Sequence, residues 1–230
     1  MSSITVVYQR LGFNPFKMTT AICVFVASLL SATSWAANSA DEALSDLQHQ
    51  WAHIYYELDE DQQEESFDKL LDTVDSYLKQ YPKNANLYAW SGIIKSTAAG
   101  TKGGLGALKL VKQAKKDLEE SLEYDATALQ GSAYTSLGIL HLRVPGWPVA
   151  FGSNKKAKEF LDKALAINPD GIDPNYFYGQ YLVEEKQFDE ARKYFNKALA
   201  AKDRPNRPLA DSGRREEIRL ALKEIEGAGR

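Results

Sequence analysis

The stretch YGQYLVEEKQFDEARKYFNKA, residues 178–198, decides the fold because it places small and aromatic residues at a spacing that suits a helical hairpin. Gly179 is followed after 12 positions by Ala191, and then by Phe195 and Ala198. Small side chains let two antiparallel helices approach closely, and large apolar side chains fill the space between neighbouring hairpins. This stretch therefore predicts two short helices packed side by side.

Two earlier segments repeat the arrangement with a wider step. Gly138 is followed by Ala157 after 19 positions, and Gly92 is followed by Ala114 after 22 positions. A repeat of roughly 30 to 45 residues predicts a helical solenoid, because one hairpin cannot bury its apolar face without a neighbour. Compared with the 12-residue step, these copies carry insertions of 7 and 10 residues. We expect the insertions to narrow a groove into a pocket or pore.

The shared positions resemble the tetratricopeptide repeat, whose pattern contains Leu-Gly, Tyr, Ala, Phe, Ala and Pro. That resemblance implies an all-α fold, a right-handed superhelix of stacked helical hairpins that ends in a C-terminal capping helix. The spacing of apolar residues also indicates helices throughout the mature chain. The expected helical segments are 41–58, 59–81, 84–98, 105–124, 126–142 and 153–167, a pair within 173–201, and a last helix after Pro208.

The first 36 residues have the composition of a signal peptide. Lys17 precedes an apolar run over residues 21–30, and Ser34-Trp35-Ala36 has the form of a cleavage site. The run is too short to be a stable membrane anchor. We therefore expect cleavage near Ala36 and a periplasmic location, with Met1 and Met18 both remaining candidate starts.

The remaining residues, 37–230, are expected to form one tetratricopeptide-like domain without a membrane anchor. The single cysteine, Cys23, lies in the leader, so the mature chain has no thiol and depends on packing for stability. Loss of Arg10 and Lys17 with the leader leaves 26 basic and 31 acidic residues, a net charge of −5. That balance disfavours nucleic acid and anionic membrane as partners.

No pattern of residues predicts catalysis, a cofactor or a metal site. The glycine-rich segment 99–104 lacks the Gly-Lys-Ser/Thr ending of a phosphate-binding loop, so we interpret it as a turn between helices. His49 and His53 share a helix face, but a third ligand would have to come from elsewhere. The charged residues of the last helix, from Asp211 to Glu217, are interpreted as a capping network. The chain is therefore expected not to be an enzyme.

The expected binding surface is the concave side, which the first helix of each pair lines. Its residues are mostly apolar with a few polar groups, and Arg143 is suited to holding a carboxylate in a bidentate pair. The segment 144–152 holds two prolines and two large aromatic residues, which either fill gaps in the core or face a ligand. The candidate ligand- or partner-binding residues are Ile93, Thr97, Thr135, Ile139, Arg143, Trp147, Phe151, Tyr176 and Gln180.

Four segments together resemble the T-component family of TRAP transporters: residues 103–108, 131–138, 144–152 and 168–174. That resemblance implies a non-catalytic periplasmic accessory protein. It would associate with a solute-binding protein and handle a small organic or apolar ligand in a cavity or pore. Members are often lipoproteins, whereas this chain has no lipid-attachment cysteine. The alternative is an envelope scaffold that binds a peptide or protein segment in its concave groove.

Overall fold

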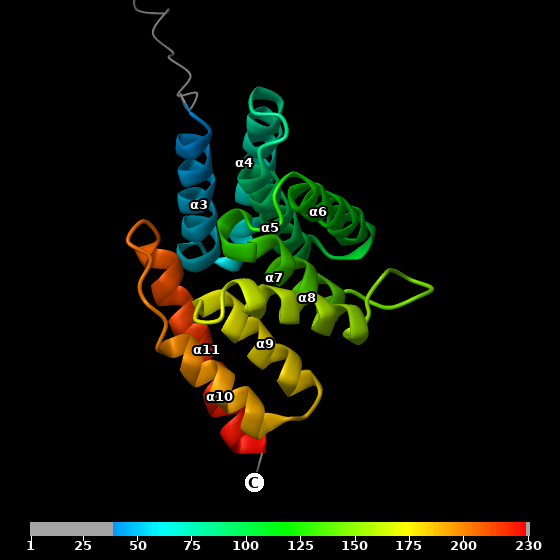
Figure 1. Ribbon diagram of the computed structural model, residues 1–230. Helices are drawn as coiled ribbons and strands as arrows, with labels where there is room; N and C mark the ends of the chain where they lie inside the picture. Colours follow the sequence, from blue (N-terminus) through cyan, green and yellow to red (C-terminus); the bar gives the residue numbers. More distant parts are fainter. Residues whose placement is uncertain (1–38, 229–230) are drawn as a thin grey trace, which may run out of the picture. The chain divides into compact units, whose positions relative to one another are not determined.

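The computed structural model describes residues 39–228, and this part of the chain folds into nine α-helices (Figure 1). The helices pack as sequential pairs, and the last helix packs against the last pair. The predicted all-α stack of hairpins is therefore confirmed. The signal peptide expected over residues 1–36 lies outside the described residues. The helices are α3 (Ala40–Glu57), α4 (Glu60–Gln80), α5 (Ala85–Lys102), α6 (Gly104–Tyr124), α7 (Ala128–Arg143), α8 (Asn154–Ile167), α9 (Ile172–Glu184), α10 (Phe188–Leu199) and α11 (Pro208–Ala228).

Close contact between paired helices depends on the glycines of the repeat. In each of the three pairs from α5 to α10, the first helix places its glycine directly against a large side chain of the second helix. A Cβ atom there would lie 2.4 Å from Leu118 Cγ at Gly92, 2.6 Å from Leu161 Cγ at Gly138, and 2.5 Å from Phe195 Cε1 at Gly179. Real Cβ atoms do not come so close, so the role predicted for the small residues is confirmed.

The first insertion lengthens two helices and does not form the expected loop over residues 99–104. Helix α5 continues to Lys102 and α6 begins at Gly104, so that a single residue separates them. That residue, Gly103, has φ 70°, in the left-handed region that glycine adopts at little cost. The sequence prediction failed here because one glycine suffices for a turn between two long helices.

The second insertion is a loop between α7 and α8 that projects from the stack of helices (Figure 1). At its base, the ring centroids of Phe151 and His141 are 5.2 Å apart, and His141 Nδ1 lies 3.1 Å from the Phe151 carbonyl oxygen. Burial lowers the pKa of His141. At its tip, the Trp147 side chain is 90% exposed. The two aromatic residues of this loop therefore differ, since Phe151 packs and Trp147 faces solvent.

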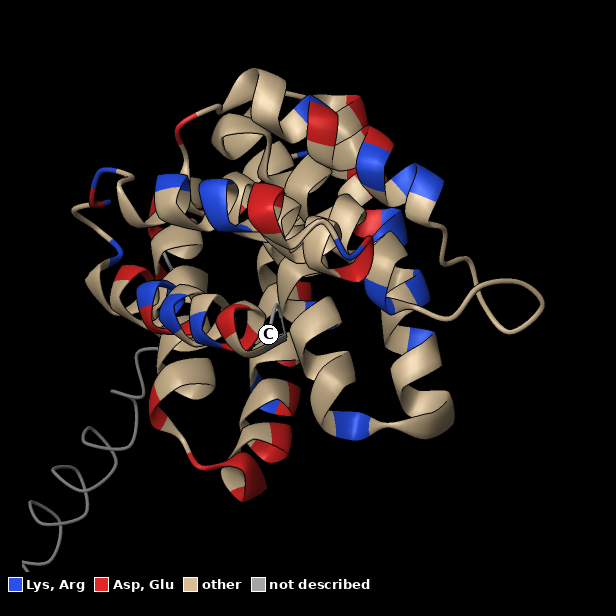
Figure 2. Cartoon of the chain, turned by 90° about the horizontal axis from the view of Figure 1, so that it is seen from below, with Lys and Arg blue, Asp and Glu red and all other residues tan. Residues whose placement is uncertain are grey.

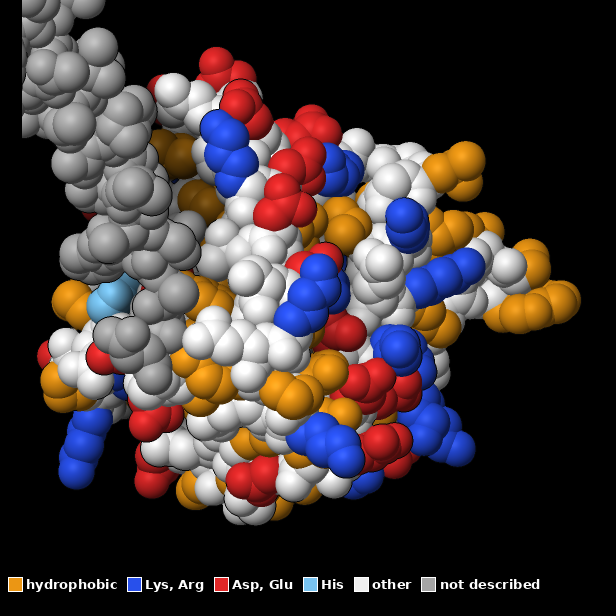
Figure 3. All heavy atoms as spheres, turned by 90° about the horizontal axis from the view of Figure 1, so that it is seen from above, with side chains coloured by type: hydrophobic (Ala, Val, Ile, Leu, Met, Phe, Trp, Pro, Cys, Tyr) orange, Lys and Arg blue, Asp and Glu red, His pale blue; other side chains and the backbone are white. Residues whose placement is uncertain are grey.

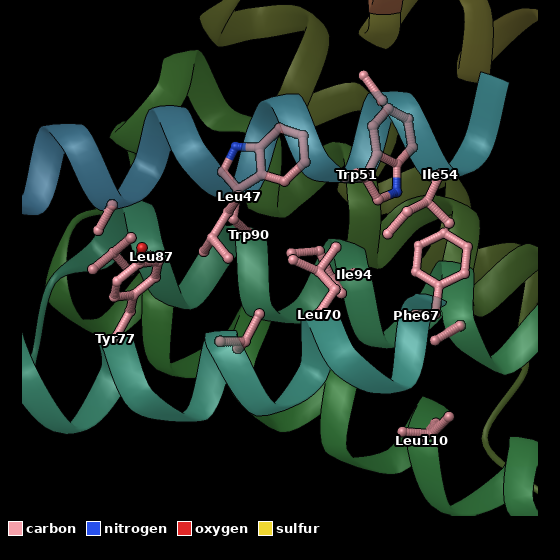
Figure 4. Close-up of a cluster of buried hydrophobic side chains, with 14 of the residues drawn as sticks. Leu47, Trp51, Ile54, Phe67, Leu70, Tyr77, Leu87, Trp90, Ile94 and Leu110 are labelled. Carbon is pink, nitrogen blue, oxygen red and sulfur yellow. The ribbon is translucent and has the colours of Figure 1, made fainter. Parts of the chain in front are cut away.

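The opening hairpin and α5 share one apolar core, shown in Figure 4. Leu47 and Trp51 of α3 face Phe67 and Leu70 of α4, and all four side chains are buried. None of the helices in the described part of the chain is both long and apolar enough to cross a membrane.

Helices α3 and α11, the first and last of the described chain, also pack against each other. A Cβ atom at Gly213 of α11 would lie 2.3 Å from Tyr56 Cδ1 of α3, so these helices touch at close range. Since nothing in the repeat pattern relates these segments, the sequence did not predict this contact.

Two glycines of α5 give a matched test of the packing. Gly92→Ala should lower the free energy of unfolding by about 1–3 kcal/mol, because the added methyl group overpacks the α5–α6 contact. Gly100→Ala should raise it by up to about 1 kcal/mol, because no atom lies within 4 Å of the new Cβ. Urea denaturation followed by circular dichroism measures both. Equal stability of the two variants would contradict the requirement for close helix contact.

Candidate functional site

A cavity of about 540 Å³ lies along the concave side of the stack, where α5, α7 and α9 supply its floor. Residues of α3 and α11 form its walls. We call this cavity the groove. A second cavity of about 930 Å³ adjoins it, and the two share the lining residues Trp90, Ser132, Thr135, Asp173 and Arg207.

Most of the predicted site residues meet in the groove. Seven of the nine line it: Ile93, Thr97, Thr135, Ile139, Arg143, Tyr176 and Gln180. The structure does not bring Trp147 and Phe151 to the groove, because both belong to the projecting loop. The second insertion therefore does not narrow the groove as expected. Helix α11 does so by packing on α3 and α9.

The sequence missed the residues that α3 and α11 contribute. Trp51 and Tyr55 lie on one wall, and Arg214 and Glu217 lie on another. The sequence predicts that the charges of α11 form a capping network. Asp211, Arg214 and Glu217 do form ion pairs, but Arg214 is also buried and lines the groove, which the sequence did not indicate. Its guanidinium carbon lies 4.7 Å from the ring centroids of both Tyr176 and Phe177. The only sequence signal was the density of arginines between residues 204 and 215.

Asp173 links α9 to the segment before α11 and to α11 itself. It accepts hydrogen bonds from Arg204 at 2.6 Å and from Arg214 at 2.9 Å, and Arg204 also pairs with Asp211 at 2.5 Å. Burial acts to raise the pKa of Asp173, but the nearby guanidinium groups outweigh it and hold the pKa well below its usual value. Asp173 lies in the first turn of α9 and is not its N-cap. The N-cap is Gly171, since α9 begins at Ile172.

Arg143, the arginine predicted to hold a carboxylate, already has partners within the protein. Its guanidinium donates to Glu184 at 3.1 Å and to Gln180 at 2.6 Å. The side chain is about half exposed at the edge of the groove. Arg143 is therefore a rim residue that an incoming carboxylate reaches only by competing with Glu184.

Arg207 is the cation of the groove that lacks a carboxylate partner. Its guanidinium carbon lies 4.9 Å from the centroid of the Trp90 ring, and its Nε atom is buried without a hydrogen-bond acceptor. Among the described residues, no carboxylate forms an ion pair with it. Burial and the neighbouring Arg204 lower the pKa of Arg207 to about 10, so it is still protonated at neutral pH. Asp173 and Asp211 favour its charged form without pairing directly with it. A desolvated cation with no directly paired carboxylate favours binding of an anion.

The candidate metal ligands of α3 are used in hydrogen bonds. His49 Nε2 lies 3.0 Å from the Asn206 carbonyl oxygen, and His53 Nδ1 lies 2.7 Å from Glu57. Within residues 39–228, no group of three or more His, Cys, Asp or Glu side chains is arranged to hold a metal ion.

A match to a known protein family supports the repeat architecture in part of the chain. Residues 149–210 match the family described as tetratricopeptide repeat. The chain is similar to the crystal structure of MamA, with 20% identity over 70% of this chain and 88% of that one, and a TM-score of 0.43. It is also similar to Pseudomonas aeruginosa PilF, with 17% identity over 80% and 92%, and a TM-score of 0.33. A search of curated proteins gave no match.

The described chain is thus an all-α, tetratricopeptide-like helical repeat of sequential pairs. None of the matches given above is a TRAP transporter component, so the resemblance to that family stays a prediction.

Loss of the Asp173 carboxylate should destabilise the wall of the groove. Asp173→Asn is expected to lower the free energy of unfolding by about 3 kcal/mol at pH 7, because it leaves two part-buried guanidinium groups underpaired. Asp203→Asn is the control, since its pair with Arg215 is exposed and should contribute less than about 1 kcal/mol. Urea denaturation at pH 7 compares the two variants.

The pH dependence of that difference follows from the lowered pKa. The contribution of Asp173 is fully present above the ordinary carboxyl value of 3.8 and is lost as the pH falls through the folded-state value. The difference in free energy of unfolding between wild type and Asp173→Asn should therefore be constant from pH 7 to about 5. A gap that closes within this range would contradict the assigned ion pairs.

Proposed function

We propose that this chain is a non-catalytic scaffold whose groove binds an extended segment of a partner protein. Stacked helical hairpins present concave surfaces of this kind to their partners. The match of residues 149–210 to the tetratricopeptide repeat supports the same reading. The groove also continues into the adjoining cavity, so the available track is longer than a single small molecule requires.

The chemistry of the lining suits a peptide backbone. More than half of the lining residues carry hydroxyl, amide or charged side chains, although the surface that they expose to the groove is more apolar than polar. Seven lining residues carry a hydroxyl group. Those of Ser96, Thr97 and Ser132 donate to carbonyl groups of their own helices, so they can accept hydrogen bonds from the N–H groups of an extended chain. The hydroxyl-bearing residues are Tyr55, Ser96, Thr97, Ser132, Thr135, Ser136 and Tyr176.

Arg207 is the observation that carries the proposal. It lies where the groove meets the second cavity, it stacks on Trp90, and it has no internal carboxylate partner. An Asp or Glu side chain, or a C-terminal carboxylate, in the partner segment would supply that partner. A charge-assisted hydrogen bond in such a site contributes about 1.5–3 kcal/mol.

Arg207→Gln should weaken binding of acidic segments by about 10- to 100-fold, because the amide cannot replace the charge. Peptide arrays first select 12-residue segments that bind; the arrays contain peptides with and without Asp or Glu, and with free or amidated C-termini. The affinity of each labelled peptide is then measured by fluorescence anisotropy. Amidated peptides separate a C-terminal carboxylate from an acidic side chain. Arg192→Gln is the control, since Arg192 pairs with Asp189 on the exposed face of α10.

Crosslinking in cells tests whether a protein occupies the groove, and it does not require a peptide chosen in advance. A photoreactive phenylalanine analogue at Ile139, on the groove floor, should crosslink to a protein, and the same group at Lys223 on α11 should not give that product. If Ile139 gives no protein adduct while peptides of every composition fail to bind, the proposal is wrong.

A second candidate is a small organic acid bound at Arg207, as an accessory protein of a transporter would hold it. The cavity volume of about 540 Å³ favours this candidate, because small-molecule sites span roughly 300–1,000 Å³. Native mass spectrometry of protein isolated from cells separates the two. A retained mass of a few hundred daltons favours the small acid and its transport role, and a bound protein favours the scaffold.

The proposed place of action is the periplasm. The leader-like composition of residues 1–36 supports export, and the cysteine-free chain that follows Ala36 is compatible with an oxidising compartment. N-terminal sequencing of the protein from fractionated cells tests both the location and the cleavage site.

A further inference from the structure

The loop between α7 and α8 presents an exposed apolar tip. Trp147 is 90% exposed and Val149 is 62% exposed. Figure 3 shows hydrophobic side chains at the projecting end of the molecule, with basic side chains behind them. Large apolar side chains held together in solvent mark a contact with another surface.

Part of the backbone of this loop is hydrogen-bonded, and its base is anchored by Phe151 against His141. Both prolines lack an N–H group, which reduces the number of donors that need a partner. A loop whose polar backbone groups are paired can enter an apolar environment at lower cost. The hydrogen bonds run from Val149 N to Gly146 O at 3.1 Å, from Gly152 N to Pro145 O at 2.9 Å, and from Ser153 N to His141 O at 2.8 Å.

The segments that flank the loop are rich in basic residues. Residues 102–116 hold five lysines, residues 143–158 hold three lysines and one arginine, and neither segment contains Asp or Glu. Most of these side chains form ion pairs with acids outside the two segments. Figure 2 shows basic bands on the helices beside the projecting loop.

Contacts place several of these lysines at the loop. Lys115 Nζ lies 5.9 Å from the centroid of the Phe151 ring, and both Lys115 and Lys156 act on the pKa of the buried His141. These two lysines pair with Glu119 and Glu159. By contrast, Lys112 lies one turn before Lys115 on α6, and Lys155 precedes Lys156 on α8. Both are exposed and form no ion pair with the described residues.

We propose that this loop docks the protein on an anionic lipid surface, with Trp147 and Val149 entering the headgroup region and Lys112 and Lys155 contacting the phosphates. Tryptophan is favoured at membrane interfaces because its ring is apolar and its N–H can still reach water. Lysines place their charge at the headgroups while their stems cover apolar surface.

The lipid surface is favoured over a partner protein by the shape and charge of the loop. A narrow tip with two apolar side chains offers little area for a protein interface, which needs about 800 Å² on each side. A lipid surface accepts such a tip without shape complementarity. The net negative charge disfavours binding of the chain as a whole to an anionic membrane. At the loop this effect is weak, because charges separated by more than about 8–10 Å are screened at physiological salt.

Vesicle binding tests the proposal with the chain from residue 37, which forms a compact unit by itself. We expect it to sediment with vesicles of phosphatidylcholine and phosphatidylglycerol, and to bind pure phosphatidylcholine at least tenfold more weakly. Tryptophan fluorescence should shift to shorter wavelength and be quenched by brominated lipids. This signal reports Trp147, because Trp51 and Trp90 are only 5% and 2% exposed.

Paired variants assign the binding to the loop. The double variant Trp147→Ala with Val149→Ser should weaken binding at least tenfold. Lys112→Gln with Lys155→Gln should weaken it about tenfold and remove the dependence on anionic lipid. The controls are Leu220→Ala and Lys223→Gln on α11, where Leu220 is 53% exposed.

Binding that is absent on anionic vesicles, or that is unchanged in the Trp147 and Val149 variant, overturns the proposal. Capture of a protein by wild type but not by this variant, without vesicle binding, assigns the loop to a protein partner and also overturns it. Groove variants such as Arg207→Gln should leave vesicle binding unchanged.

Discussion

The ion pairs of Asp173 join parts of the chain that the repeat itself does not hold together. One carboxylate accepts from Arg204 in the segment before α11 and from Arg214 within α11. These contacts tie the last helix to α9, and α11 in turn packs on α3. The concave side of the stack is therefore bounded on two sides. Helix α11 lies across it, held by this pairing together with its buried side chains Ile218, Ala221 and Ile225.

This pairing also explains why the groove has a charged end. Arg204 and Arg214 have carboxylate partners, and their positive charge remains next to Arg207, which has none. The Trp90 ring supports the Arg207 guanidinium from one side. The same cluster thus stabilises the fold and leaves one arginine available to an anion, so stability and recognition share one set of residues.

Two surfaces of the domain differ in chemistry. The groove is partly open, is lined by apolar, hydroxyl and charged groups, and contains arginine. The projecting loop is exposed, with apolar side chains at its tip and lysines around its base. Arginine suits paired recognition of a carboxylate, whereas lysine acts as a point charge that tolerates many geometries. A scaffold that rests on a membrane through one surface would leave the other available to a protein segment.

The sequence by itself determined the helical pairs and the face that each pair turns toward the groove. Large side chains of the partner helices pack against Gly92, Gly138 and Gly179. The spacing of these glycines in the repeat predicts this contact. Seven of nine predicted site residues line the groove for the same reason, since position on a helix face follows from the repeat.

Only the tertiary structure shows that α3 and α11 pack against each other and form walls of the groove. Their contact joins Tyr56 and Gly213, which are separated by most of the chain, and no periodicity relates them. The structure also shows that Phe151 packs while Trp147 is exposed. The sequence could not distinguish the two, because a loop of this composition fits either environment. Local spacing encodes the contact within a hairpin, whereas closure of the groove depends on how several hairpins accumulate curvature along the stack.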